Sequence, residues 1–167
     1  MAGDPMNLNA EPVPIMSDPW LTTLAAWSET ALGPEWKAHC GVWPPDAAPP
    51  AVLWRMIGMD VRVLGPSSFE VRKRMTAFFQ TDDTDQEHAA VLRLLEGLGA
   101  AIKIPLDGGA ARRYLRIVEP KMSVPTEGTE GGTTAAGPLT VTLIQRTAKP
   151  SAEAPLMQFV QYQSKMR

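Results

Sequence analysis

The stretch from Pro50 to Gln80 constrains the fold of this chain most, because it holds two long β-rich runs separated by the turn-forming residues 65–68 (Gly-Pro-Ser-Ser). Along the second run, apolar residues fall mainly on one parity and charged residues on the other, which is typical of a strand with one buried face. The first run is apolar on both parities in its first half. We therefore predict a long hairpin whose first strand is central in a sheet at one end.

Strand alternation also assigns the side chains of this hairpin to faces. One face of the first run would carry Leu53, Ile57, Met59, Val61 and Val63. The apolar face of the second run is interrupted once, by Lys73. The solvent-exposed face of the hairpin would carry four arginines, which are Arg55, Arg62, Arg72 and Arg74.

The composition fits a single domain with a substantial core, since the chain has 167 residues of which 44% are hydrophobic. The formal net charge of -2 argues against a dedicated nucleic-acid binder, which usually carries a basic surplus. The only cysteine, Cys40, excludes a disulfide within the chain and gives no sign of an oxidising compartment.

No targeting or membrane segment is expected from the sequence. The first sixteen residues contain three prolines and no basic region before an apolar run, so they do not fit a signal peptide. No stretch approaches the roughly 18 apolar residues of a membrane span. We therefore expect the protein in a cytoplasm, or in a particle assembled there.

A helix is expected before the hairpin. Ser17 would be its N-cap, and the Gly33-Pro34 pair would stop it. Trp20 and Trp27 lie on one side of this helix, which favours a place in the core over a ligand site. The short run 35–43 is then predicted as an edge strand.

A second helix is expected after the hairpin, preceded by an acidic run that contains Asp82, Asp83, Asp85 and Glu87. Thr84 and Glu87 have the spacing of a capping box, and acidic residues suit the positive end of a helix dipole. Calcium binding is disfavoured because the glycine and distal glutamate of an EF-hand loop are missing. Val91, Leu94, Leu95 and Leu98 give the stripe of a helix on a sheet, and Gly97 and Gly99 would end it.

The last part of the chain predicts further strands. A short strand at 102–106 precedes a strand at 113–124, which is bent or marked as an edge by Pro120, and another strand at 138–146. The glycine-rich segment 125–137 would make the last two strands a long hairpin with a flexible tip. That tip could order on a partner or remain a plain disordered loop.

Together these elements predict an α+β fold, with a mixed or antiparallel sheet and two amphipathic helices packed on one of its faces. The predicted organisation is an extended N-terminal arm at 1–16, a domain at 17–146, and a C-terminal linker with a possible added strand at 147–167. The segment 156–164 would be that strand, and it could close its own sheet or add to the edge of a neighbour.

No catalytic signature is found in the sequence. His39 and Cys40 are adjacent, so along a strand they point to opposite faces, and the other histidine, His88, is distant. A zinc site would need more ligands than these, and no phosphate-binding loop is present. We expect no cofactor and no metal, and an enzyme built on Cys40 and a histidine is the least favoured hypothesis.

The order of elements resembles the tail terminator (tail-completion) proteins of tailed bacteriophages and of phage-tail-like contractile particles. The resemblance runs roughly from Ser17 to Arg146. It is carried by patterns, namely the helix at 20–32, the proline-flanked 52–57 run, the 69–79 strand with its basic outer face, the 84–98 helix and the 139–144 strand. The glycine-rich loop and the tail after Arg146 depart from it.

The resemblance implies a non-enzymatic protein that forms a ring, typically six-fold, which caps a tail tube, stops its growth and faces the neck. Its expected partners are other copies of itself, tail tube and sheath proteins, and head–tail connector proteins where a head is present. A closed ring needs two different patches that meet head to tail. The four arginines of the hairpin and the acidic set Asp82, Asp83, Asp85 and Glu87 are candidates, unless both are simply solvated surface.

Two alternatives remain. The chain could be another neck or baseplate protein of the same kind of particle. It could also be a nucleic-acid-binding module that uses Arg72, Arg74 and Arg112–Arg113, although the sequence does not indicate the exposed aromatic residues that single-strand readers place on a basic sheet. Neither direct nucleic-acid reading nor a membrane is expected.

Overall fold

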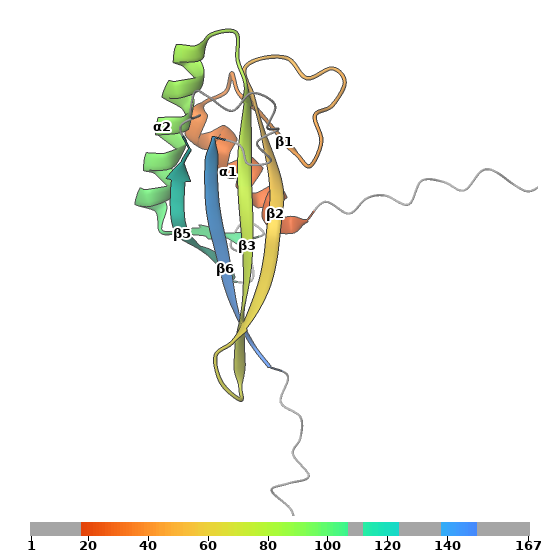
Figure 1. Cartoon of the computed structure of the whole chain (residues 1–167), viewed down its shortest axis with the longest axis vertical. Coiled ribbons are helices and arrows are strands. Elements are labelled where there is room, and N and C mark those ends of the chain that lie inside the picture. The colour runs from red at the N-terminus through yellow and green to blue at the C-terminus, as the bar shows by residue number, and fades with distance from the viewer. Residues whose placement is uncertain (1–17, 107–111, 124–137, 150–167) are drawn as a thin grey trace, which may run out of the picture.

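The computed structural model describes residues 18–106, 112–123 and 138–149. The predictions for the N-terminal arm 1–16, the loop 125–137 and the segment 156–164 fall outside these residues, as does Ser17. Within the described part, two helices accompany a six-stranded sheet with the strand order β1-β2-β3-β6-β5-β4 (Figure 1). The elements are α1 Pro19–Leu32, β1 Lys37–Cys40, β2 Ala51–Val63, β3 Ser68–Gln80, α2 Thr84–Ala101, β4 Lys103–Pro105, β5 Tyr114–Met122 and β6 Leu139–Ala148.

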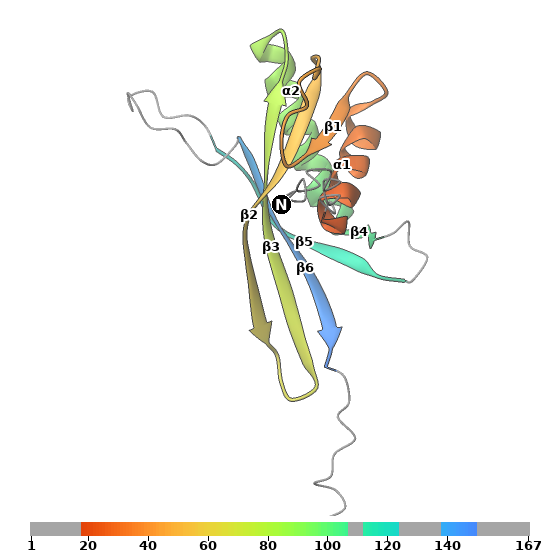
Figure 2. The same ribbon diagram turned by 90° about the vertical axis from the view of Figure 1, so that its right-hand side faces the viewer.

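The sheet is mixed. β1 runs parallel to β2, and every other neighbouring pair is antiparallel. Both helices cover the same face of this curled sheet (Figure 2), and their apolar stripes form one core with its inner side chains. The expected α+β fold with two helices on one face is therefore confirmed.

The central position of β2 at one end is also confirmed. Residues 51–54 pair with β1 on one side and β3 on the other, and all four are buried. Trp54 is completely buried, and its indole N–H donates to Ser28 Oγ of α1 over 2.8 Å. The Ser28 hydroxyl in turn donates to the Leu24 carbonyl oxygen, so the sheet and α1 share a buried polar connection.

One expectation about the faces of β2 is wrong. A β-bulge lies between Met56, which pairs with Met75, and Gly58, which pairs with Arg74, so Ile57 is the extra residue. One inserted residue reverses the parity of everything beyond it. Leu53 therefore faces away from the helices, whereas Met59, Val61 and Val63 lie on the helix side of the sheet.

Asp18 is the N-cap of α1, because its carboxylate accepts a hydrogen bond from the backbone N–H of Trp20 at 2.8 Å, so the prediction of Ser17 as the N-cap is wrong. Pro19 occupies the first turn and Gly33 follows the last, as the sequence indicates. Trp20 is buried, and Trp27 packs against the core cluster. The prediction of a core role for both tryptophans is confirmed.

The boundaries of α2 differ from the prediction. Asp83 is the N-cap, because its carboxylate accepts from the backbone N–H of Asp85, and Thr84 is the first helical residue. The helix also continues through both glycines to Ala101. Gly97 lies beneath Trp27 of α1, where an added Cβ would come within 3.1 Å of the indole ring. This glycine permits the two helices to approach, and it does not end α2.

The later strands follow the prediction closely. β5 carries a register shift between Val118 and Lys121, at the position of Pro120, and Glu119 there has a φ of 51°. β6 runs two residues beyond the predicted end, to Ala148, and pairs with both β3 and β5. The long β5–β6 hairpin is therefore present, with its tip outside the described residues.

Candidate assembly surface

The β2–β3 hairpin extends far beyond the helices. We call its outer part, Met56–Val63 of β2 and Ser68–Arg74 of β3, the arm. Figure 2 shows the arm projecting away from α1 and α2 with β6 beside it. β6 pairs along β3 as far as Ser68, and the Lys149 N–H donates to the Ser67 carbonyl over 2.8 Å, so the last described residue of the chain lies at the hairpin turn.

One edge of the arm is open among the described residues. β1 pairs only with residues 51–54 of β2, so residues 56–63 have a strand on the β3 side alone. Such an edge presents unpaired backbone donors and acceptors and is a ready template for another strand.

On the helix-side face of the arm, the β2 row is apolar and exposed. Met59, Val61 and Val63 are exposed by 59, 58 and 65%. Their partners on β3 are Lys73, Val71 and Phe69, so two apolar pairs lie side by side next to the turn. An open edge combined with an exposed apolar face is the pattern of a surface that another chain covers.

The bulge places all four predicted arginines on the other face. Arg55 pairs with Thr76, Arg74 with Gly58, and Arg62 with Glu70, and residues directly opposite each other in an antiparallel pair share a face. Arg55 precedes the bulge and Arg62 follows it, so without the inserted residue they would lie on opposite faces. The sequence prediction of one arginine face is confirmed.

The arginines of this face have more neighbours within the chain than the sequence suggests, so they are less available to a partner. Arg72 lies opposite Asp60, and Arg62 lies opposite Glu70, so acidic neighbours partly balance these two charges. The guanidinium of Arg74 lies over Gly58, where an added Cβ would come within 2.6 Å of it. Arg55 stacks over Phe78, with its guanidinium carbon 5.9 Å from the ring centroid.

Further basic residues share this face, and sequence reasoning missed them. Arg146 pairs with Glu70, and Arg116 pairs with Ile144, which itself pairs with Arg72. Lys103 of β4 pairs with Arg116. The alternation of each strand was visible in the sequence, but the order of strands that joins these residues to the arginines depends on long-range pairing.

The acidic set lies at the opposite end of β3 from the hairpin turn. β3 runs from the turn to Gln80, and α2 begins four residues later (Figure 1). The acidic set is exposed except for the partly buried Glu87. Within one chain the structure therefore does not bring the acidic set and the arginines near the turn together. A head-to-tail contact between copies requires two different patches, and these two patches are separate and of opposite charge.

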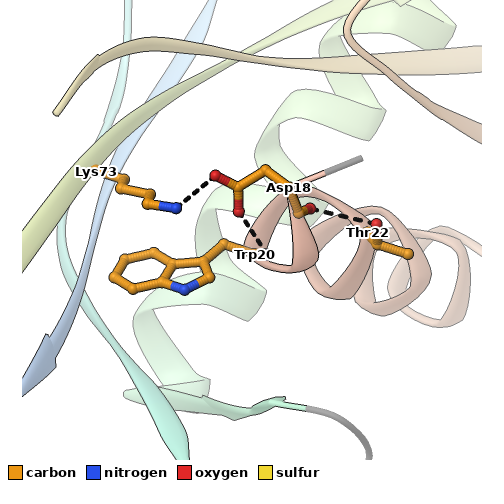
Figure 3. A network of polar contacts seen from close by, with 4 residues as sticks. All are labelled: Asp18, Trp20, Thr22 and Lys73. Carbon is orange, nitrogen blue, oxygen red and sulfur yellow. Dashed lines mark hydrogen bonds and ion pairs between the residues drawn. The ribbon is translucent and has the colours of Figure 1, made fainter. Parts of the chain in front are cut away.

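Lys73, which interrupts the apolar parity of β3, joins the root of the arm to α1. Its ammonium forms an ion pair with the Asp18 carboxylate, and Figure 3 shows it beside the Trp20 ring. The Nζ atom is 4.5 Å from the centroid of that ring. A lysine on the core side is thus satisfied by an ion pair and a cation–π contact where the helix cover ends.

The catalytic hypothesis gains no support from the geometry. Burial raises the pKa of the Cys40 thiol, which disfavours the nucleophilic thiolate. His39 stacks edge-on with Trp43, at 5.9 Å between ring centroids. His88 lines a pocket of about 330 Å³ with Glu87 and Ser123, far along the chain from Cys40. Among the described residues, no cluster of three potential metal ligands occurs.

Neither a membrane-spanning helix in the part of the chain that the structure describes nor a match to a protein family or a curated protein adds to this description. No helix within the described ranges is both long and apolar enough to cross a membrane. No protein-family model matches the chain, and a search of curated proteins also gives no match. The case for a function therefore depends on the arm, its open edge and its charged faces.

Proposed function

We propose that this chain is a structural subunit that assembles with copies of itself into a closed ring. In line with the resemblance described above, the ring would cap a tail tube, end its polymerisation and join it to the neck of a phage or phage-tail-like particle. Another neck or baseplate role in the same particle is the nearest alternative. The partners would be copies of this chain, tail tube and sheath proteins, and head–tail connector proteins where a head exists.

The observation that carries the proposal is the arm. A hairpin with an apolar face and an unpaired edge is a poor surface for a monomer, because it invites uncontrolled strand pairing. A subunit interface removes that problem by covering both features at once. The hydrophobic area on the arm and the basic side behind it are what a lateral contact between subunits would use.

Charge gives this contact a direction. The acidic start of α2 and the arginine face lie on different parts of the molecule, so copies could associate head to tail and close a ring. Complementary charge mainly fixes orientation and association rate, whereas burial of the apolar arm would supply the affinity.

The decisive test is electron microscopy of particles assembled with and without this chain. If the proposal is correct, particles lacking it have tails of irregular length or tails that fail to join heads. Normal tails of uniform length, properly joined, would refute the terminator role.

A second candidate function has one observation in its favour. Tyr114 is 42% exposed on the basic side of the sheet, and Lys103 Nζ is 4.5 Å from its ring centroid. An exposed aromatic among arginines is a feature of single-strand readers that the sequence did not indicate. Fluorescence anisotropy with labelled single-stranded and duplex DNA at increasing salt tests it. Affinity that falls steeply with salt would support this candidate.

A further inference from the structure

The open edge of the arm has backbone N–H and C=O groups that lack a neighbouring strand. Eight residues, Met56–Val63, run without a strand on their outer side among the described residues. A β-strand supplied by another segment would satisfy the outward backbone groups, which is the mode of recognition called β-augmentation. The segment must be free of proline over its length and about as long as the edge.

The chain itself contains such a segment. Eighteen residues, 150–167, lie beyond the described part, and β6 leads them out at the hairpin turn, directly beside the arm. Within them, 156–164 reads LMQFVQYQS, which has no glycine, proline or charge. Phenylalanine, valine and tyrosine are residues that favour strands. Its nine residues match an edge of eight.

The added strand could come from the same chain or from a second copy. The apolar helix-side face of the arm, which must also be covered, distinguishes between the two. A segment folding back on its own arm would add one row of side chains at the edge. It would leave the helix-side faces of Met59, Val61 and Val63 exposed, together with the open side of the partly buried Phe69. A second copy would supply both a strand that pairs with the edge and a folded domain that covers the helix-side face of the arm.

We infer that residues 156–164 of one copy add as a strand to the Met56–Val63 edge of the next copy. This inference rests on the proposed ring and names the contact that would hold it together. Repeated around a closed ring, each copy donates one strand and receives one, which is a heterologous interface. The segment 150–155 begins and ends with proline and would serve as the spacer between donor and acceptor.

Crosslinking between two tagged populations tests the inference. Both carry Cys40→Ala, which removes the native thiol. One also carries Val61→Cys with a size tag, and the other carries Val160→Cys. The two populations are mixed, allowed to assemble and then treated with a short thiol-reactive crosslinker. The expected product is a crosslinked dimer that contains one chain from each population. Replacing Val61→Cys by Val42→Cys, at an exposed site outside the arm, should abolish this product.

A chain that carries both Val61→Cys and Val160→Cys separates the alternatives. Crosslinking only within that chain would mean that the segment folds back on its own arm, and the inference would be wrong. Absence of crosslinking in both arrangements would overturn it equally. Hydrogen exchange gives an independent readout, since truncation after Pro155 should raise the exchange of residues 56–63 at least tenfold while the exchange of α1 and α2 stays unchanged.

The failure of this inference is distinguishable from failure of the proposed function. Rings that form without the intermolecular crosslink, in particles whose tails depend on the chain, would refute only the strand donation. An intermolecular crosslink in a chain whose absence leaves tails normal would refute only the role in tail completion.

Discussion

At the scale of single residues, the most informative side chains are polar groups in apolar surroundings. Ser28 of α1 accepts a hydrogen bond from the indole N–H of Trp54 and donates one to the Leu24 carbonyl oxygen, each over 2.8 Å, and both Ser28 and Trp54 are fully buried. Lys73 lies between strand and helix and is neutralised by Asp18. Each of these polar groups has a specific hydrogen-bond or ion-pair partner, as polar groups inside a fold require.

Replacing Ser28 by alanine should therefore destabilise the protein. The indole N–H of Trp54 would lose its acceptor in a buried site, at a cost of about 1–3 kcal/mol in the free energy of unfolding. Urea denaturation followed by tryptophan fluorescence measures this. Thr30→Ala is the matched control, since Thr30 lies on the exposed side of the same helix and should change stability by less than about 0.5 kcal/mol. Equal effects of both substitutions would contradict the prediction.

Cys40 gives a prediction about pH. Burial raises the pKa of its thiol above the ordinary value of 9.0, so the folded chain keeps this proton to higher pH than the unfolded chain does. Because the folded state then binds more protons, stability should fall as pH rises through and above that value. Cys40→Ala should remove this part of the decline in denaturation curves measured across alkaline pH. The folded chain should also react with iodoacetamide more slowly than the chain in urea, and equal rates would count against it.

At the scale of elements, the β-bulge decides which faces the hairpin presents. Ile57 is the one residue of β2 without a cross-strand partner in the pairing with β3. It allows buried Trp54 and exposed Val61 to lie on the helix side although their numbers differ in parity. Gly97 plays a comparable part between the helices, because its missing side chain leaves room for Trp27.

Deleting Ile57 should consequently be tolerated. Removal of the extra residue leaves Met56 opposite Met75 and Gly58 opposite Arg74, so every side chain keeps its face. Deleting Met59 is the matched control. The strand could absorb that loss only by bringing Ile57 under Arg74 and Gly58 opposite Lys73, which should cost more stability, by about 1 kcal/mol or more. Thermal unfolding of the two variants compares them, and a larger loss for the Ile57 deletion would refute the role of the bulge.

At the scale of the whole molecule, a net charge of -2 conceals an uneven distribution. Among the described residues, strand pairing places nine basic residues on the side of the sheet away from the helices, against two acidic residues, Asp60 and Glu70. The basic residues are Lys37, Arg55, Arg62, Arg72, Arg74, Lys103, Arg116, Lys121 and Arg146. The acidic set lies at the start of α2. This separation of charge is the basis for the proposed head-to-tail association of copies of the chain.

Charge reversal tests that association directly. The pair Arg72→Glu and Arg74→Glu should weaken assembly at least tenfold, because like charges would meet at the interface. Asp82→Lys with Asp85→Lys should do the same, and a chain with all four changes should regain assembly. Light scattering gives the mass of each variant, and circular dichroism checks that it is folded. Arg112→Glu, at an exposed site outside the arginine face, is the control. Unchanged masses throughout would place the interface elsewhere.

Local patterns in the sequence are sufficient to predict the elements and their layering. Short-range periodicity reflects which side of an element is buried. The helical spacing of Trp20, Trp27 and the leucines of α2 therefore predicts the two helices. The alternation along β2 and β3 predicts the hairpin and its central end. Capping was less certain, because several acidic residues adjoin the start of α2 and only geometry selects Asp83.

The surfaces that these elements present depend on long-range contacts that local patterns do not encode. The place of β6 between β3 and β5, the parity change at Ile57 and the separation of the acidic set from the arginines near the turn all depend on pairings between distant segments. Strand alternation fixes two faces for each strand, but it does not say which face is which once a residue is inserted or which strand lies beside it. The open edge of the arm follows from the same cause, since β1 pairs with only four residues of β2.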